Sequence, residues 1–262
     1  MKSILVSIAI ILLTVFWGCK SHDDSTPIPS SGSSTETSAI SFHLHTYIGS
    51  NNEVDAYNAV YHNDDGRAIS LSFAQLYISN IKLVKRDGSI YPISDTIILT
   101  DIVDQVYKLG NVLIGNYKSV SFDVGLPSAT NATVPTGTPA KLNDVNMWFS
   151  NTAAANNYIF MHAAGKIDTS VSKNGANGKM APFEYKIGTQ SRLVHVTMPD
   201  QNVAVQPGTT AYIHILADYS ELFKGINISD ITNLTVETIA DNSGDVATDV
   251  TSRISNMFKY EN

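Results

Sequence analysis

Two closely spaced histidines are the side chains of this sequence best suited to bind a soft metal ion. His43 and His45 are separated by one residue, within a stretch in which polar and apolar residues alternate. On a β-strand this spacing places both imidazole rings on one face, where they can share an ion. Imidazole is a donor that Cu(I) favours. The pair therefore predicts a copper site, and the alternative is two strand histidines that only face solvent.

Three further side chains complete the candidate donor set. The thioethers of Met147 and Met161 flank the segment that contains Trp148, the only tryptophan after residue 18. Thioether sulfur is a second donor type suited to Cu(I). We predict that Trp148 or one of the two methionines provides a third contact to an ion held by His43 and His45. In the simpler alternative, Trp148 and Met161 are core residues.

The other histidines offer weaker patterns. His195 and His214 stand between apolar neighbours in alternating stretches, so we expect exposed or hydrogen-bonded strand residues rather than ligands. His162 follows Met161 and would point to the opposite face of a strand, and His62 precedes a turn. No G-x-S-x-G, H-E-x-x-H or phosphate-binding loop occurs. We expect a binding protein rather than an enzyme.

The N-terminus resembles that of a bacterial lipoprotein. Lys2 precedes an apolar run that is too short to remain as a membrane-spanning helix and ends directly before Cys19, the only cysteine. We therefore predict a signal peptide over residues 1–18 and lipidation of Cys19. Residues 19–37 are rich in Ser, Thr and Pro and predict a disordered tether. One domain is expected over residues 38–262.

The net negative charge of the chain argues against nucleic acid and anionic membrane surfaces as partners. The chain has 17 basic and 24 acidic residues, and no basic cluster. Such a chain binds nucleic acid or an anionic membrane surface poorly. The expected membrane contact is therefore the lipid on Cys19. We expect an outer-membrane lipoprotein, exposed to the periplasm or at the cell surface.

Short alternating stretches separated by Gly, Pro and Asn turns predict an all-β fold, an antiparallel β-sandwich with a few short helices. A change of phase at Asn80 predicts a β-bulge. Helical spacing of apolar residues predicts a helix over residues 247–258, near the C-terminus, and a shorter one is expected over 218–223. The predicted strands are 39–47, 57–61, 68–73, 76–85, 97–104, 119–124, 158–162, 183–187, 191–198 and 210–216.

Several short segments, taken in their order along the chain, resemble those of the MbnP-like family of exported copper-binding proteins. The most specific match is LYISNIKL at residues 76–83, and the resemblance extends from about residue 40 to 258. It implies copper handling outside the cytoplasm and, in some members, a di-haem peroxidase-like partner. It also implies that an oxidised tryptophan, here Trp148, helps a histidine to hold Cu(I). The other matching segments are SFHLH (41–45), VYHNDDG (60–66), GNYKSVSFDVG (115–125), MWF (147–149), YIF (158–160) and SRISNMF (252–258).

The sequence departs from this family at one position that matters for the metal. Lys186 stands where a histidine is common, and a protonated lysine does not bind copper. Two functions therefore remain open. One is a copper-binding module, and the other is a metal-free surface lipoprotein that binds a glycan or a protein.

Overall fold

The computed structural model describes residues 35–93, 95–102, 105–135, 139–150, 154–176 and 178–261. Residues 35–262 belong to one compact unit. The predicted signal peptide, Cys19 and the tether up to residue 34 lie outside the described residues. Among the residues described, no helix is both long and apolar enough to cross a membrane.

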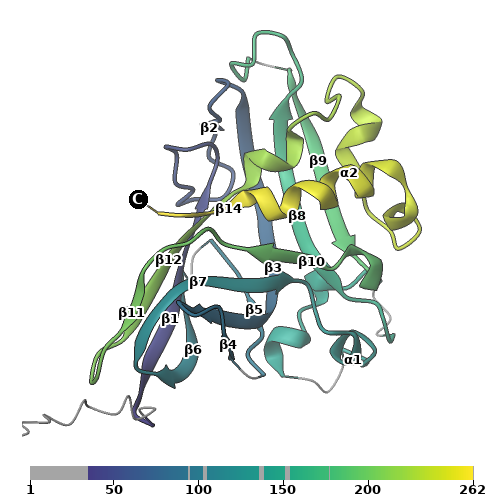
Figure 1. Cartoon of the computed structure of the whole chain (residues 1–262). Coiled ribbons are helices and arrows are strands. Elements are labelled where there is room, and N and C mark those ends of the chain that lie inside the picture. The colour runs from purple at the N-terminus through teal and green to yellow at the C-terminus, as the bar shows by residue number, and fades with distance from the viewer. Residues whose placement is uncertain are drawn as a thin grey trace, which may run out of the picture. The chain divides into compact units, whose positions relative to one another are not determined.

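The chain forms two β-sheets with a few short helices, as the sequence predicted (Figure 1). The smaller sheet has the strand order β14–β12–β1–β6. The larger follows the path β10–β7–β3–β8–β9–β13, with β11 beside β7 and with β2, β4 and β5 beside β3. The strands are β1 Thr37–Tyr47, β2 Tyr61–His62, β3 Ala68–Lys85, β4 Ile90–Pro92, β5 Ile98–Leu99, β6 Val106–Leu113, β7 Gly115–Val124, β8 Ile159–Asp168, β9 Met180–Gly188, β10 Val194–Thr197, β11 Val203–Val205, β12 Ala211–Asp218, β13 Thr235–Val236 and β14 Phe258–Tyr260.

Most strand pairs are antiparallel, but β1 and β12 pair in parallel, as do β13 and β9. The first of these pairs joins an early and a late segment of the domain at the centre of the smaller sheet (Figure 1). Alternation within a single strand contains no information about such a partner.

The two sheets are held together by apolar side chains on their facing sides. Phe42 of β1 meets Phe122 of β7 edge to face, with 5.8 Å between ring centroids, and Phe122 meets Phe258 in the same way at 5.0 Å. Such aromatic pairs add to the free energy gained by burial alone. Phe42 and Leu44 are buried, so the residues that alternate with them on β1 face away from this core.

One long strand replaces two predicted short ones. Strand β3 runs without a break over Ala68–Lys85, where two strands ending and starting near residues 73 and 76 were predicted. The predicted bulge at Asn80 is confirmed. Asn80 has a φ of 51°, and the register with β7 shifts between Ser79 and Lys82. Strand β6 was not predicted.

Helices are few and mostly 3₁₀. Helix α2, Asp245–Ile254, confirms the helix predicted near the C-terminus, with Ala247, Val250 and Ile254 buried. It does not reach Phe258, because that residue begins β14 and pairs with β12. The short helix predicted over 218–223 is η4, Tyr219–Phe223. The other helices are α1 Ser128–Asn131, η1 Ala140–Leu142, η2 Val145–Met147, η3 Gln190–Arg192, η5 Ile231–Leu234, η6 Asp241–Ser243 and η7 Ser255–Met257.

Candidate metal centre

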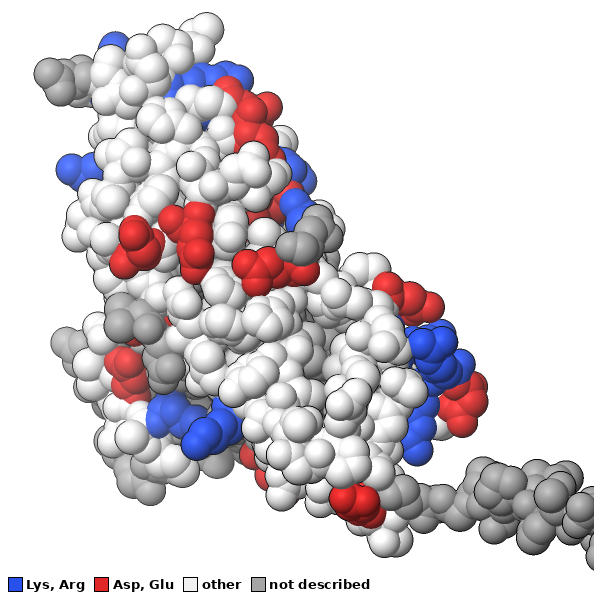
Figure 2. Space-filling view, turned by 90° about the vertical axis from the view of Figure 1, so that its left-hand side faces the viewer, with Lys and Arg blue, Asp and Glu red and all other residues white. Residues whose placement is uncertain are grey.

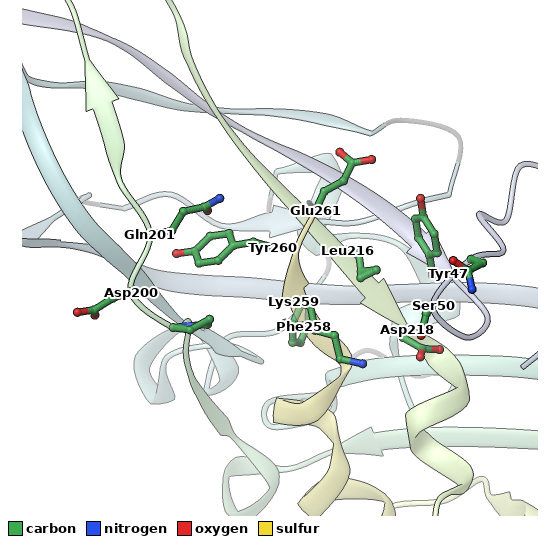
Figure 3. Close-up of a pocket in the computed structure, with 12 residues that line it drawn as sticks. Tyr47, Ser50, Asp200, Gln201, Leu216, Asp218, Phe258, Lys259, Tyr260 and Glu261 are labelled. Atoms are coloured by element: carbon green, nitrogen blue, oxygen red, sulfur yellow. The ribbon is translucent and has the colours of Figure 1, made fainter. Parts of the chain in front are cut away.

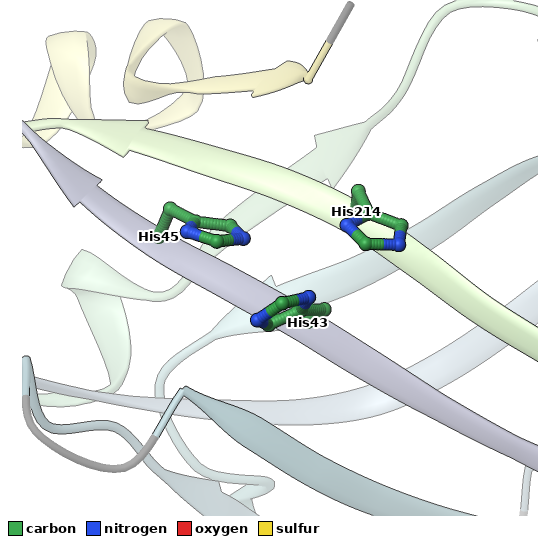
Figure 4. A group of neighbouring side chains, drawn as sticks. All are labelled: His43, His45 and His214. Carbon is green, nitrogen blue, oxygen red and sulfur yellow. The ribbon is translucent and has the colours of Figure 1, made fainter. Parts of the chain in front are cut away.

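Three histidines come together on the smaller sheet (Figure 4). His43 and His45 lie on β1, and His214 lies on β12 directly beside His43. The ring centroids are 4.2 Å apart for His43 and His45, and 4.8 Å apart for His43 and His214. One nitrogen from each ring can be chosen so that all three lie within 4.8 Å of one another. The sequence prediction that His43 and His45 share a strand face is confirmed.

Strand alternation explains why all three rings share this face. Phe42 and Leu44 on β1, like Ile213 and Ile215 on β12, are buried in the core. The histidines between them therefore project on the other side of the sheet. Parallel pairing then aligns the two strands so that His43 and His214 are neighbours. We call His43, His45 and His214 the histidine cluster.

His45 is the most enclosed member of the histidine cluster, with 8% of its surface exposed. Its Nδ1 donates a hydrogen bond to Oε1 of Glu53 at 2.7 Å. Glu53 is held there by a β-bridge to Tyr47. The other nitrogen, Nε2, is buried and has no hydrogen-bond partner among the described residues. An acceptor nitrogen in that position is available as a metal ligand.

A second carboxylate stands at the open side of the histidine cluster. Oε2 of Glu261 lies 3.2 Å from Nδ1 of His214 and 3.5 Å from Nε2 of His45. Glu261 follows β14, and its backbone N–H donates to the His214 carbonyl at 3.3 Å. The short edge strand β14 therefore fixes the position of this carboxylate.

The electrostatics favour a neutral ring at His43. Burial lowers the pKa of His43, and the nearby His45 and His214 lower it further, while Glu261 and Glu53 act in the opposite direction. A lowered pKa keeps the imidazole unprotonated to lower pH. Only an unprotonated ring nitrogen can bind a metal ion.

Two grooves lie beside Glu261, and the smaller of them reaches His214 of the histidine cluster. One, of about 770 Å³, is lined by residues of β12 and β14 together with Tyr47 and Glu261. Figure 3 shows the Glu261 carboxylate projecting from β14 and Asp218 beside the end of β12. The other, of about 310 Å³, is lined by His214 and Glu261 among others. A small ion can therefore reach the cluster from outside.

The other predicted ligands lie in a different part of the fold. Met161 is on β8 of the larger sheet, paired with Leu76 and Ile187. Met147 ends the 3₁₀ helix η2, and Trp148 forms a β-bridge with Tyr158. All three predicted ligands are buried, and none of them belongs to the smaller sheet. The third ring beside His43 and His45 comes instead from His214.

Lys186, which occupies the position where the family commonly has histidine, lies on β9 beside His162 of β8. Its Nζ is 2.7 Å from Oε1 of Glu184. The same oxygen is 3.1 Å from Nε2 of His162, whose Nδ1 is 3.0 Å from the Asn146 carbonyl. Both nitrogens of His162 therefore have hydrogen-bond partners, whereas Nε2 of His45 has none among the described residues. Burial lowers the pKa of His162.

The sequence analysis gave no metal-binding role to three members of this site: it interpreted His214 as an exposed or hydrogen-bonded strand residue, and it did not single out Glu53 or Glu261. Ile213-His214-Ile215 has the same pattern as Phe42-His43-Leu44, which was a usable signal. That pattern shows only that His214 faces outward. The parallel pairing that brings it to His43 appears only in the folded structure.

Comparison with known proteins adds two findings. The MbnP family model matches residues 37–240 of this chain. Among solved structures, the fold is similar to that of MbnP from Methylosinus trichosporium, with a TM-score of 0.53 and 16% sequence identity. That match covers 74% of this chain and 80% of the other. No curated protein matches the sequence.

Proposed function

The chain belongs to the MbnP family, and from this premise we propose that its histidine cluster binds copper outside the cytoplasm. The observation that carries the proposal is the Nε2 atom of His45. It is buried and lacks a hydrogen-bond partner among the described residues, and its ion-pair neighbour there is Oε2 of Glu261 at 3.5 Å. A buried acceptor without a partner is costly unless something binds it. A copper ion supplies that partner.

The donor set suits copper. Three imidazoles form a set that both Cu(I) and Cu²⁺ accept, and copper binds N-donor sites more tightly than the other divalent ions of the first row. The formal net charge of −7 attracts cations over the whole surface. Figure 2, which faces the side of the molecule that is on the left in Figure 1, shows acidic side chains gathered across its middle. Basic side chains lie mainly toward the margins of that view.

The proposed role is capture and holding of the ion rather than catalysis. Lipid on Cys19 would anchor the protein at the outer membrane, facing the periplasm or the cell surface. The family resemblance supports a di-haem peroxidase-like protein as the partner. Lys186 does not count against the proposal, because it lies beside His162 in the larger sheet and not in the histidine cluster.

Competition for Cu(I) against a chelator tests the proposal, with the full chain in detergent micelles. We expect the His43→Ala/His45→Ala double variant and His214→Ala each to weaken binding by about tenfold or more, since each removes imidazole rings that would hold the ion. His195→Ala is the matched control, because His195 is exposed and bonded to Asp123 on the larger sheet. Unchanged affinity in the double variant would refute the site. A parent chain that does not bind copper would leave the metal-free surface module as the function.

A further inference from the structure

We infer that Glu261 is a fourth donor of this site, an oxygen donor, so that the site holds divalent ions such as Zn²⁺ or Cu²⁺ as well as Cu(I). The inference rests on the proposed function and adds the class of ion that the site accepts. Glu261 lies beyond residue 240, where the match to the family model ends. The carboxylate is therefore a feature of this chain that the family assignment does not supply.

The first support is geometric. In a tetrahedral zinc site with bonds of about 2.0–2.1 Å, neighbouring donor atoms are about 3.3–3.4 Å apart. Oε2 of Glu261 is 3.2 Å from Nδ1 of His214 and 3.5 Å from Nε2 of His45. One oxygen thus lies at donor-to-donor distance from two ring nitrogens at once. The contact with Nδ1 of His214 is a hydrogen bond, and a bound ion would replace its proton. The ligand atom of His43 lies within 4.8 Å of those of His45 and His214, so His43 would have to approach them further to complete a tetrahedral set.

The second support is the arrangement of protons. Nδ1 of His45 carries the proton that it donates to Glu53, so a neutral ring has its lone pair on Nε2. Nε2 of His45 and Oε2 of Glu261 are 3.5 Å apart and make no hydrogen bond with each other. A positive charge between the two atoms stabilises both, either as the proton of an imidazolium ring in an ion pair or as a metal ion bound by both atoms.

The third support is charge balance. The buried carboxylate of Glu221 has lysine partners, Lys224 at 2.6 Å and Lys259 at 3.2 Å. Within the described part of the chain, Glu261 has ion pairs only with His45 and His214, and Glu53 only with His45. Two carboxylates without a lysine or arginine partner favour a doubly charged ion over a singly charged one. Carboxylate oxygen is also a better donor for Zn²⁺ than for the softer Cu(I).

Titration of the full chain with Zn²⁺ by calorimetry, beside Cu(I) competition, tests the inference. We expect Glu261→Gln to weaken Zn²⁺ binding by about tenfold or more and to leave Cu(I) affinity within about threefold of the parent value. Glu237→Gln is the control, because Glu237 is an exposed glutamate without an ion pair among the described residues. In the electron paramagnetic resonance spectrum of the Cu²⁺-loaded chain, Glu261→Gln should shift the copper parameters and Glu237→Gln should not.

The outcomes separate this inference from the proposed function. A parent chain that binds Cu(I) but not Zn²⁺ or Cu²⁺ overturns the inference and leaves the proposed function intact. Equal losses of Zn²⁺ and Cu(I) affinity in Glu261→Gln also overturn it, since the carboxylate would then act only by orienting the rings. A parent that binds Zn²⁺ through Glu261 but does not bind Cu(I) supports the inference and refutes the copper assignment.

Discussion

In the proposed metal site, the carboxylate of Glu53 would prepare the ring of His45 to bind the ion. Its Nδ1 donates to Glu53, which fixes both the tautomer and the rotation of the imidazole. In metal sites such partners sustain affinity although they do not touch the ion, and their loss typically weakens binding by about 10- to 100-fold. Glu53 is thus a positioning residue, distinct in role from Glu261.

Glu53→Ala should therefore weaken Cu(I) and Zn²⁺ binding together, by about 10- to 100-fold, because the ring loses its acceptor. Glu53→Gln retains an amide oxygen that accepts from Nδ1 and should restore most of the Cu(I) affinity. Chelator competition with both variants checks this, beside Asp65→Asn, which changes an exposed carboxylate in the turn after β2. Equal losses in the Ala and Gln variants would contradict the positioning role.

The sequence was sufficient to predict that His43 and His45 share a face, because that property depends only on the two-residue period of a strand. It could not supply His214 or Glu261, since their place beside His43 depends on which strands pair. The prediction of Met147, Trp148 or Met161 as a third contact was based on donor chemistry alone. The structure places those three side chains with the larger sheet.

Strand β3 is the element on which most of the larger sheet is built. It pairs with β7 on one side and β8 on the other, and β2, β4 and β5 also pair with it. Its bulge at Asn80 lets one strand serve all these partners by shifting the register with β7. The change of alternation phase was enough to predict the bulge, but not that the strand continues through Ala74 and Gln75.

We expect Asn80→Val to lower the free energy of unfolding by about 1–3 kcal/mol, because a β-branched residue is strained at the φ of 51° found there. Asn80→Gly loses the same hydrogen bond from Nδ2 to Asp123, so the difference between the two variants isolates the backbone cost. Urea denaturation measures both, and Ser72→Val is the control for adding valine at an exposed site of the same strand. Equal stability of the Val and Gly variants would show that the bulge carries no such strain.

Elements with weak alternation were harder to predict. Strand β6 reads VYKLGNVL, and only Leu109 and Val112 in it are buried. Its partner β1 supplies the register, with a shift between Ile40 and Ser41 opposite Gly110. The predicted C-terminal helix extended to Phe258 because the spacing of apolar residues continues to that point. Met257 and Phe258 are indeed buried, but they belong to η7 and β14 rather than to α2.

For the whole molecule, we predict that attachment to a membrane depends on lipid at Cys19, because the chain is acidic and has no basic cluster. Cys19→Ala should therefore release the chain into the soluble envelope fraction after signal cleavage, whereas Ser21→Ala should remain with the membrane. Multiple acyl chains anchor a protein far more firmly than one, so the expected change is nearly complete. Cell fractionation followed by immunoblotting measures how the protein is distributed between the membrane and soluble fractions. Retention of the Cys19→Ala protein on the membrane would refute the lipid anchor.

The parallel pairing of β1 with β12 also has a consequence for when the protein can acquire its ion. His43 lies near the start of the domain, while His214 and Glu261 lie near its end. A partly synthesised chain does not hold them together, because most of the domain's length separates them. If the chain crosses a membrane unfolded, as the predicted signal peptide implies, its histidines are still apart in the compartment that it leaves. The ion that we propose for the histidine cluster would then come from the compartment in which the last strands dock.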